Sequence, residues 1–163
     1  MIQRRTILGL LATLPVLGPV LGPVLGPMLW LAGPALAAAP EVYSQAGLAI
    51  SGTDPVAYFR DGAAVRGHLD FALMWHGATW AFATAENMEA FEMNPDAYAP
   101  QFGGYCAFAL AQGTLASTVP DAWTIYQGRL YLNYSLSVRD QWTADIPGNL
   151  ARAAERWPRI LQS

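Results

Sequence analysis

The chain of 163 residues contains a single cysteine, Cys106, and its thiol is the side chain best suited to chemistry. Cys106 follows the pair Gly103-Gly104 and lies in an apolar, alanine-rich run that ends before Gly113. This composition predicts a buried helix. The first turn of a helix offers unpaired backbone N–H groups and the positive end of the helix dipole, which stabilise a thiolate. Such a sulfur acts as a nucleophile or as a soft-metal ligand. The plainer alternative is a small apolar cysteine that packs among alanines.

The absence of a second cysteine limits the thiol chemistry. An internal disulfide and a CxxC-type zinc or redox motif are both excluded. A thiol mechanism in this chain therefore requires an external thiol as reductant. We expect Gly103, Gly104 and Tyr105 to form the pocket around the sulfur of Cys106.

Soft-metal binding is the second chemistry that these residue types allow. Thiolate and thioether sulfurs are the ligands that Cu(I) prefers. The candidate metal ligands are therefore Cys106, Met93 and His76, with copper as the candidate cofactor. The alternatives are that Met93 fills a core, as methionine usually does, and that His76 is simply exposed in a turn before Gly77.

Several functional classes find no support in the sequence. It contains no glycine-rich phosphate loop, no hydrolase nucleophile elbow and no two-histidine metal helix. Nine basic residues, all of them arginine, stand against 12 acidic residues and give a net charge of −3. Nucleic-acid-binding proteins instead carry a basic surface. Asp54, Asp121 and Asp145 lie near predicted helix starts or turns, where capping is the expected role.

Short hairpins and helices must position the thiol. Apolar and aromatic runs predict one hairpin over residues 70–75 and 78–83 and another over residues 122–126 and 129–133. A helix is expected to start at Thr53, which would cap it, and another at Thr84, with Met88, Phe91 and Met93 facing inward. Asn94-Pro95 breaks that helix, and Pro95 begins a single turn.

The last part of the chain predicts two further helices. One begins after Ser135 and runs through Trp142, and the other begins at Pro147 with Ala151, Ala154 and Trp157 on one face. Together these elements predict a small single α+β domain, residues 38–163, with short antiparallel hairpins packed against several helices.

The N-terminus has the features of a secretory signal peptide. Arg4 and Arg5 precede a run without charged residues, and Ala35-Leu36-Ala37 is a small-residue cleavage site. The segment from Arg4 to Leu8 resembles a twin-arginine signal. Repeated Gly-Pro pairs over residues 18–27 disfavour a membrane-spanning helix. We expect residues 1–37 to be removed after Ala37, leaving a periplasmic protein without a membrane span. An uncleaved anchor is the alternative.

Three motifs in order resemble one known family. They are Gly52-Thr53-Asp54-Pro55-Val56-Ala57-Tyr58-Phe59, then Asn94-Pro95 with Tyr98-Ala99-Pro100-Gln101-Phe102-Gly103-Gly104-Tyr105-Cys106-Ala107, then Gly128-Arg129-Leu130-Tyr131-Leu132-Asn133-Tyr134. They resemble the YHS domain-containing (seleno)proteins, which are small exported bacterial proteins. Some members similar to this chain place selenocysteine at the position of Cys106, which implies redox or nucleophilic chemistry there. The resemblance also implies metal binding in the wider YHS group, often through cysteines that this chain lacks.

Three functions follow from these patterns. The first is thiol-based redox chemistry or soft-metal handling centred on Cys106, with an external thiol reductant or a metal ion as partner. The second is a non-enzymatic module that binds copper or another ligand. The third is a structural or interaction domain in which Cys106 is inert and buried. Enzymatic and non-enzymatic roles both remain open at this point.

Overall fold

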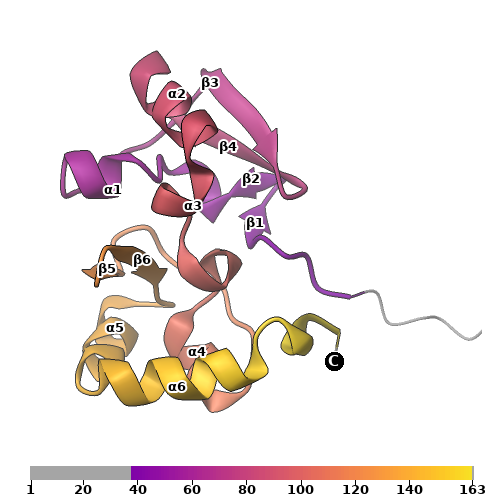
Figure 1. The fold of residues 1–163 in the computed structure, drawn as a ribbon, viewed down its shortest axis with the longest axis vertical. Helices are drawn as coiled ribbons and strands as arrows, with labels where there is room; N and C mark the ends of the chain where they lie inside the picture. The colour runs from indigo at the N-terminus through magenta and orange to yellow at the C-terminus, as the bar shows by residue number, and fades with distance from the viewer. Residues whose placement is uncertain (1–37, 163) are drawn as a thin grey trace, which may run out of the picture. The chain divides into compact units, whose positions relative to one another are not determined.

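The computed structural model describes residues 38–162 of the chain. The predicted signal peptide and its cleavage site lie outside the described residues. In the described part, a mixed four-stranded sheet, a separate two-stranded sheet and six α-helices form an α+β fold, as the sequence predicts (Figure 1). None of the helices in residues 38–162 is long and apolar enough to cross a membrane.

The four-stranded sheet is built around the first predicted hairpin. Its strand order is β1 (Ser44–Gln45), β2 (Leu48–Ala49), β4 (Ala78–Phe82) and β3 (His68–Trp75). β3 and β4 are antiparallel, and β2 joins β4 in parallel. His76 and Gly77 both adopt positive φ, at 47° and 76°, as a two-residue hairpin turn requires. The sequence analysis missed the two short strands β1 and β2, whose pattern is too brief to detect.

The apolar face of this sheet is covered by α2 (Ala85–Met93), which Thr84 caps as predicted by accepting a hydrogen bond from the Asn87 N–H at 3.1 Å. Phe91 is buried and stacks on Trp80 with ring centroids 5.1 Å apart. Met93 is 80% exposed, so its predicted inward orientation is wrong. It is the last residue of the helix and lies beyond the face that Phe91 buries.

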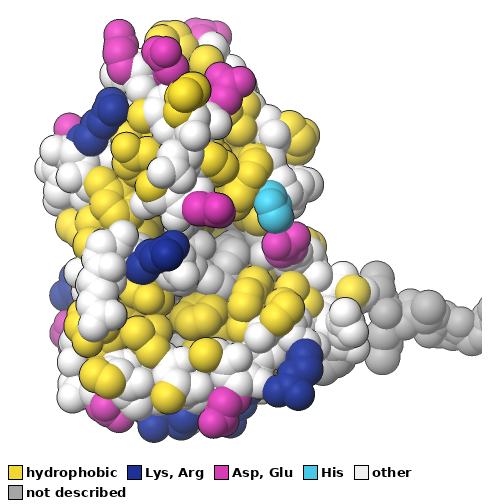
Figure 2. All heavy atoms as spheres, viewed as in Figure 1, with side chains coloured by type: hydrophobic (Ala, Val, Ile, Leu, Met, Phe, Trp, Pro, Cys, Tyr) yellow, Lys and Arg dark blue, Asp and Glu magenta, His cyan; other side chains and the backbone are white. Residues whose placement is uncertain are grey.

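Acidic side chains gather over the α2 end of the molecule (Figure 2).

A buried carboxylate joins the sheet to two helices. Asp54 is fully buried and accepts hydrogen bonds from the backbone N–H groups of Val56, Ala57 and Ala83, at 2.8, 3.2 and 2.8 Å. Its fourth donor is Asn87 Nδ2, at 2.7 Å. The N-cap residue of α1 (Ala57–Arg60) is Val56, so the predicted cap by Thr53 is wrong, and it is Asp54 that accepts from the N–H groups at the start of this helix. The Asp54 carboxylate also ties the ends of β4 and α2 together, a role beyond local capping.

The rest of the chain forms the second predicted hairpin and a helical layer. β5 (Trp123–Tyr126) and β6 (Arg129–Leu132) are antiparallel. The remaining helices are α3 (Pro95–Tyr98), α4 (Ala107–Gln112), α5 (Leu136–Thr143) and α6 (Ile146–Arg156), with 3₁₀ turns η1 (Ile50–Gly52), η2 (Gln101–Gly104) and η3 (Arg159–Gln162). α4 lies along α6 (Figure 1), where Leu110 and Ala111 pack against Ala153.

The buried face of α6 differs from the prediction. Asn149 and Ala153 are buried, whereas Ala151 and Ala154 are exposed. The buried face instead contains Ile146, Leu150 and Ala153, which follow the helical period and pack in the two core clusters of the helical layer. Trp157 packs on this face, as predicted. Asn149 is also buried, and its Nδ2 donates to the carbonyl of Trp142 at 3.0 Å. Asp145 caps the helix through the Gly148 N–H at 3.0 Å, as expected.

Candidate functional site

The Gly103-Gly104 pair places Cys106 at the start of α4 because only glycine fits there. Phe102, Gly103 and Gly104 have φ values of 57°, 60° and 82°. A side chain at Gly103 would overlap the backbone carbonyl of Glu41, and one at Gly104 would come within 2.7 Å of Ile50 Cγ2. The two glycines therefore let the N-terminal segment pack directly on the turn that precedes the thiol. As a result Cys106 is 1% exposed.

The sulfur of Cys106 is held by three hydrogen bonds. It accepts from the backbone N–H of Ala109 at 3.4 Å, which makes Cys106 the N-cap residue of α4. It also accepts from the backbone N–H of Tyr134 at 3.3 Å, directly after β6. The thiol can donate to Asn133 Oδ1, which lies 3.7 Å from Sγ. Two N–H dipoles therefore converge on the sulfur, an arrangement that stabilises negative charge on it.

Asn133 is a site residue that the sequence analysis did not single out. It is fully buried, and its Oδ1 also accepts from the Phe108 N–H at 3.2 Å. Its Nδ2 is buried and has no hydrogen-bond partner among the described residues. A signal for Asn133 was available in the sequence: it is a polar residue at the end of an apolar strand, Leu130-Tyr131-Leu132. Burying an amide there costs free energy unless the amide forms hydrogen bonds.

The segment between α4 and β5 covers the thiol from the other side. The backbone N–H of Cys106 donates to the carbonyl of Ala116 at 3.1 Å. Thr118 is buried, and its hydroxyl donates to the carbonyl of Gly104 at 2.9 Å. This covering segment, residues 113–122, is therefore hydrogen-bonded to Gly104 and to Cys106, the two neighbours of Tyr105 in the chain. Sequence reasoning missed it because its irregular backbone has no periodic pattern.

A cavity of about 570 Å³ lies against this covering segment. Its lining residues come from the N-terminal strands, the segment before β3, the covering segment and the end of β6: Tyr43, Gln45, Ser51, Arg66, Ser117, Thr118, Val119, Pro120 and Tyr134. Two of them bond directly to the thiol-bearing segment, Tyr134 to Sγ of Cys106 and Thr118 to Gly104. The cavity therefore borders the neighbours of Cys106, although Cys106 itself is not part of its lining.

Tyr105, expected in a pocket around the thiol, is largely buried. Its ring contacts Tyr43 and Trp157 at centroid distances of 5.7 and 6.3 Å, and its hydroxyl donates to the carbonyl of Pro40 at 2.9 Å. Burial raises the pKa of the Tyr105 phenol. Tyr105 therefore anchors the N-terminal segment, while Tyr43, its stacking partner, lines the cavity.

The candidate metal ligands lie on separate elements. Met93 is at the exposed end of α2, and His76 is in the β3–β4 turn, where its Nδ1 lies 2.9 Å from Glu41 Oε1. His76 and Gly103 do line one small cavity, of about 100 Å³. No hydrogen bond or ion pair in residues 38–162 joins Met93 or His76 to Cys106. Among those residues, no group of three or more His, Cys, Asp or Glu side chains is placed to hold a metal ion.

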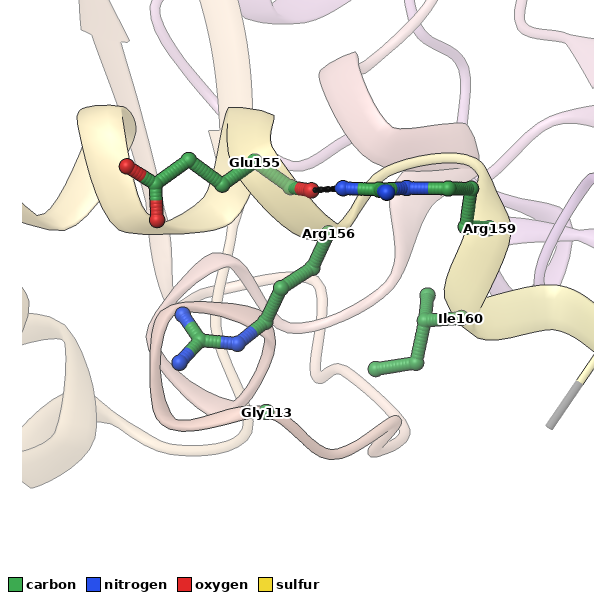
Figure 3. Close-up of a pocket in the computed structure, with 5 residues that line it drawn as sticks. All are labelled: Gly113, Glu155, Arg156, Arg159 and Ile160. Atoms are coloured by element: carbon green, nitrogen blue, oxygen red, sulfur yellow. Dashed lines mark hydrogen bonds between the residues drawn. The ribbon is translucent and has the colours of Figure 1, made fainter.

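A second hollow lies away from the thiol. It has a volume of about 400 Å³ and is lined by Gly113, Glu155, Arg156, Arg159 and Ile160 (Figure 3). Arg156 reaches back from α6 toward Gly113 and donates to the carbonyl of Ala111 at 3.0 Å. Arg159 donates to the carbonyl of Glu155. Both guanidinium groups thus bond to backbone carbonyls at the helix ends.

Comparisons with protein-family models, with curated proteins and with solved structures found no match for this chain. The functional argument therefore depends on the geometry around Cys106.

Proposed function

We propose that this chain is an exported YHS-like protein in which the Cys106 thiol exchanges with a small external thiol–disulfide couple. The observation that carries the proposal is the convergence of two backbone N–H groups on Sγ, from Ala109 at 3.4 Å and Tyr134 at 3.3 Å. The thiolate is the form that attacks a disulfide, and a negatively charged sulfur at this position would keep both donors.

The proposed reaction has two steps. The Cys106 thiolate attacks one sulfur of a small disulfide, RSSR, which forms a Cys106–S–SR mixed disulfide and releases RS⁻. An external thiol, R′SH, then attacks the R sulfur of the mixed disulfide, which releases Cys106 as the thiol and forms RSSR′. No second protein cysteine takes part, in accordance with the single cysteine of the chain.

Burial supports a second candidate, an inert structural cysteine. Cys106 is 1% exposed and caps α4. In this role the sulfur ties the start of α4 to the end of β6 and undergoes no reaction. The soft-metal role, with Cys106, Met93 and His76 as candidate ligands on three separate elements, also remains a proposal.

Exchange in the folded state separates the two candidates. We would incubate the protein with bis(2-hydroxyethyl) disulfide and follow the mixed disulfide by mass spectrometry over a series of low urea concentrations, with Cys106→Ala as the control without a thiol. A redox thiol reacts at a rate that is independent of urea below the unfolding transition. A rate that rises with urea in parallel with the unfolded population would show that only unfolding exposes the sulfur, and would favour the structural role.

A further inference from the structure

Deepening the proposed function, we infer that the cavity beside Cys106 binds the carboxylate end of the small thiol or disulfide that exchanges with the thiol. The substrate class is a low-molecular-weight thiol, or its disulfide, that carries a carboxylate on a short aliphatic chain. This inference rests on the proposed function, and the experiment below distinguishes its failure from the failure of that function.

The charge in the cavity is positive although the protein is acidic. Arg66 is the only charged residue in the lining, and no carboxylate in residues 38–162 forms an ion pair with it. Its Nη1 donates to the carbonyl of Ser51 at 3.3 Å, which leaves other guanidinium donors for a ligand. A guanidinium binds a carboxylate through paired N–H donors. In a chain with 12 acidic and nine basic residues, this cation is available for an anionic ligand.

The backbone beside Arg66 is strained. Ile50, Ser51 and Gly52 have consecutive φ values of 42°, 59° and 76°. A β-branched residue such as Ile50 rarely adopts positive φ, so this turn costs free energy that the surrounding fold must offset. Hydrogen bonds hold it from both sides, from the Ile50 N–H to the Tyr43 carbonyl at 3.1 Å and from the Gly67 N–H to the Gly52 carbonyl at 3.0 Å. The turn places Ser51 and Arg66 together at the cavity.

The rest of the lining suits a small molecule that is polar at one end. The side chains of Gln45, Ser51 and Ser117 make no hydrogen bond within the described residues and can bond to a carboxylate beside Arg66. Tyr43, Val119, Pro120 and Tyr134 form the apolar part of the wall. Short aliphatic chains pack against such surfaces.

Tyr134 links the cavity to the sulfur, because it lines the cavity and bonds to Cys106. Its backbone N–H donates to Sγ of Cys106, while the residue as a whole is 55% exposed. A ligand that fills the cavity would therefore contact the residue whose backbone N–H bonds to the thiol.

The test compares three disulfides that differ in charge. The reagents are 3,3′-dithiodipropionate, with a carboxylate at each end, the neutral bis(2-hydroxyethyl) disulfide, and cystamine, with an ammonium at each end. Dividing each rate with folded protein by the rate with urea-unfolded protein cancels the intrinsic reactivity of the reagent. We expect the folded protein to prefer the dicarboxylate over the neutral reagent by about fivefold, as for one partly exposed ion pair, and to disfavour cystamine.

Arg66→Gln should abolish this preference without changing the rate of the neutral reagent. Arg129→Gln is the matched control, because Arg129 is also exposed and donates to a backbone carbonyl, that of Asp96 at 3.4 Å, but lines a different hollow. Added salt should weaken the preference in the unsubstituted protein, since it screens exposed charges. Equal rates for all three reagents, or an unchanged preference in Arg66→Gln, would overturn the inference while leaving the proposed function intact.

A binding measurement covers the case in which no reagent reacts with the folded protein. That result refutes the proposed exchange, and the cavity is then tested with 3,3′-thiodipropionate, a thioether dicarboxylate that cannot exchange. Binding to Cys106→Ser, followed by NMR shifts of the residues around the cavity and lost in Cys106→Ser with Arg66→Gln, would retain a carboxylate site. No shift at these residues would overturn it.

Discussion

Replacing Cys106 tests what the sulfur contributes to the fold separately from its reactivity. Cys106→Ala removes the acceptor for two backbone N–H groups, those of Ala109 and Tyr134. A buried N–H without a partner costs about 1–3 kcal/mol. Both hydrogen bonds are only partly buried, so each belongs at the lower end of that range. Lost packing of the sulfur adds about 1 kcal/mol. We expect Cys106→Ala to lower the free energy of unfolding by about 3 kcal/mol.

Cys106→Ser gives the matched comparison. Its hydroxyl keeps an acceptor for the same N–H groups and a donor for Asn133 Oδ1, but it is smaller than a thiol and reaches less far. We expect a loss of about 1–2 kcal/mol, smaller than for Cys106→Ala. Neither variant should form a mixed disulfide.

Urea unfolding followed by tryptophan fluorescence measures both differences, since two of the six tryptophans, Trp80 and Trp142, are buried. Equal dependence of the unfolding free energy on urea would show that the variants unfold from the same compact state. A Cys106→Ala variant within about 0.5 kcal/mol of the unsubstituted protein would refute the assigned hydrogen bonds. A serine variant less stable than the alanine variant would show that the site disfavours a buried hydroxyl, and would contradict the role of the sulfur as a hydrogen-bond acceptor there.

Three further predictions address other parts of the structure. Asp54→Asn should lower stability by about 2–4 kcal/mol in urea unfolding, because an amide cannot accept from all four donors of the carboxylate; the exposed Asp121→Asn should change stability by less than about 0.5 kcal/mol. Burial raises the pKa of Tyr58, Tyr105 and Tyr131, so the unfolded chain loses phenol protons first and stability should fall as the pH rises above about 10; Tyr58→Phe should reduce that fall between about pH 9 and pH 11. In a Cu(I) titration, Cys106→Ala should bind copper more weakly than the unsubstituted protein if the thiol is a ligand, and equal affinities would remove Cys106 from any copper site.

Local patterns predicted most of the elements. The His76-Gly77 and Gln127-Gly128 turns were recognised because two-residue hairpins need positive φ at their central positions, and both turns have it. Thr84, Ser135 and Asp145 cap helices as their types suggest. The predictions for Met93 and for the buried face of α6 were wrong although local spacing contained the signal. Met93 is two residues from Phe91, which places it off the face that Phe91 buries, and Ile146, Leu150 and Ala153 follow the helical period on α6.

The same division applies to the candidate site. The sequence identified Cys106 and the glycines before it, since a single cysteine at a predicted helix start is recognised from neighbouring residues alone. Asn133 was missed although its position after an apolar strand was a signal, whereas the covering segment with Thr118 and the cavity with Arg66 left no pattern in the sequence. Those residues lie between 12 and 40 positions from Cys106, and no periodic pattern links them to it.

By itself, the sequence determined the α+β class, the hairpins, the helix starts and the single thiol, because turns and caps are set by neighbouring residues. Only the tertiary structure decided that this thiol is buried, that two N–H groups converge on it, and that Arg66 lies in a cavity beside it. These features depend on how separate segments pack: the close approach allowed by Gly103 and Gly104, and the covering of α4 by the residues around Thr118 and Tyr134. The burial of the thiol and the position of the Arg66 charge relative to it depend on the packing of distant segments, so they are defined only in the folded chain.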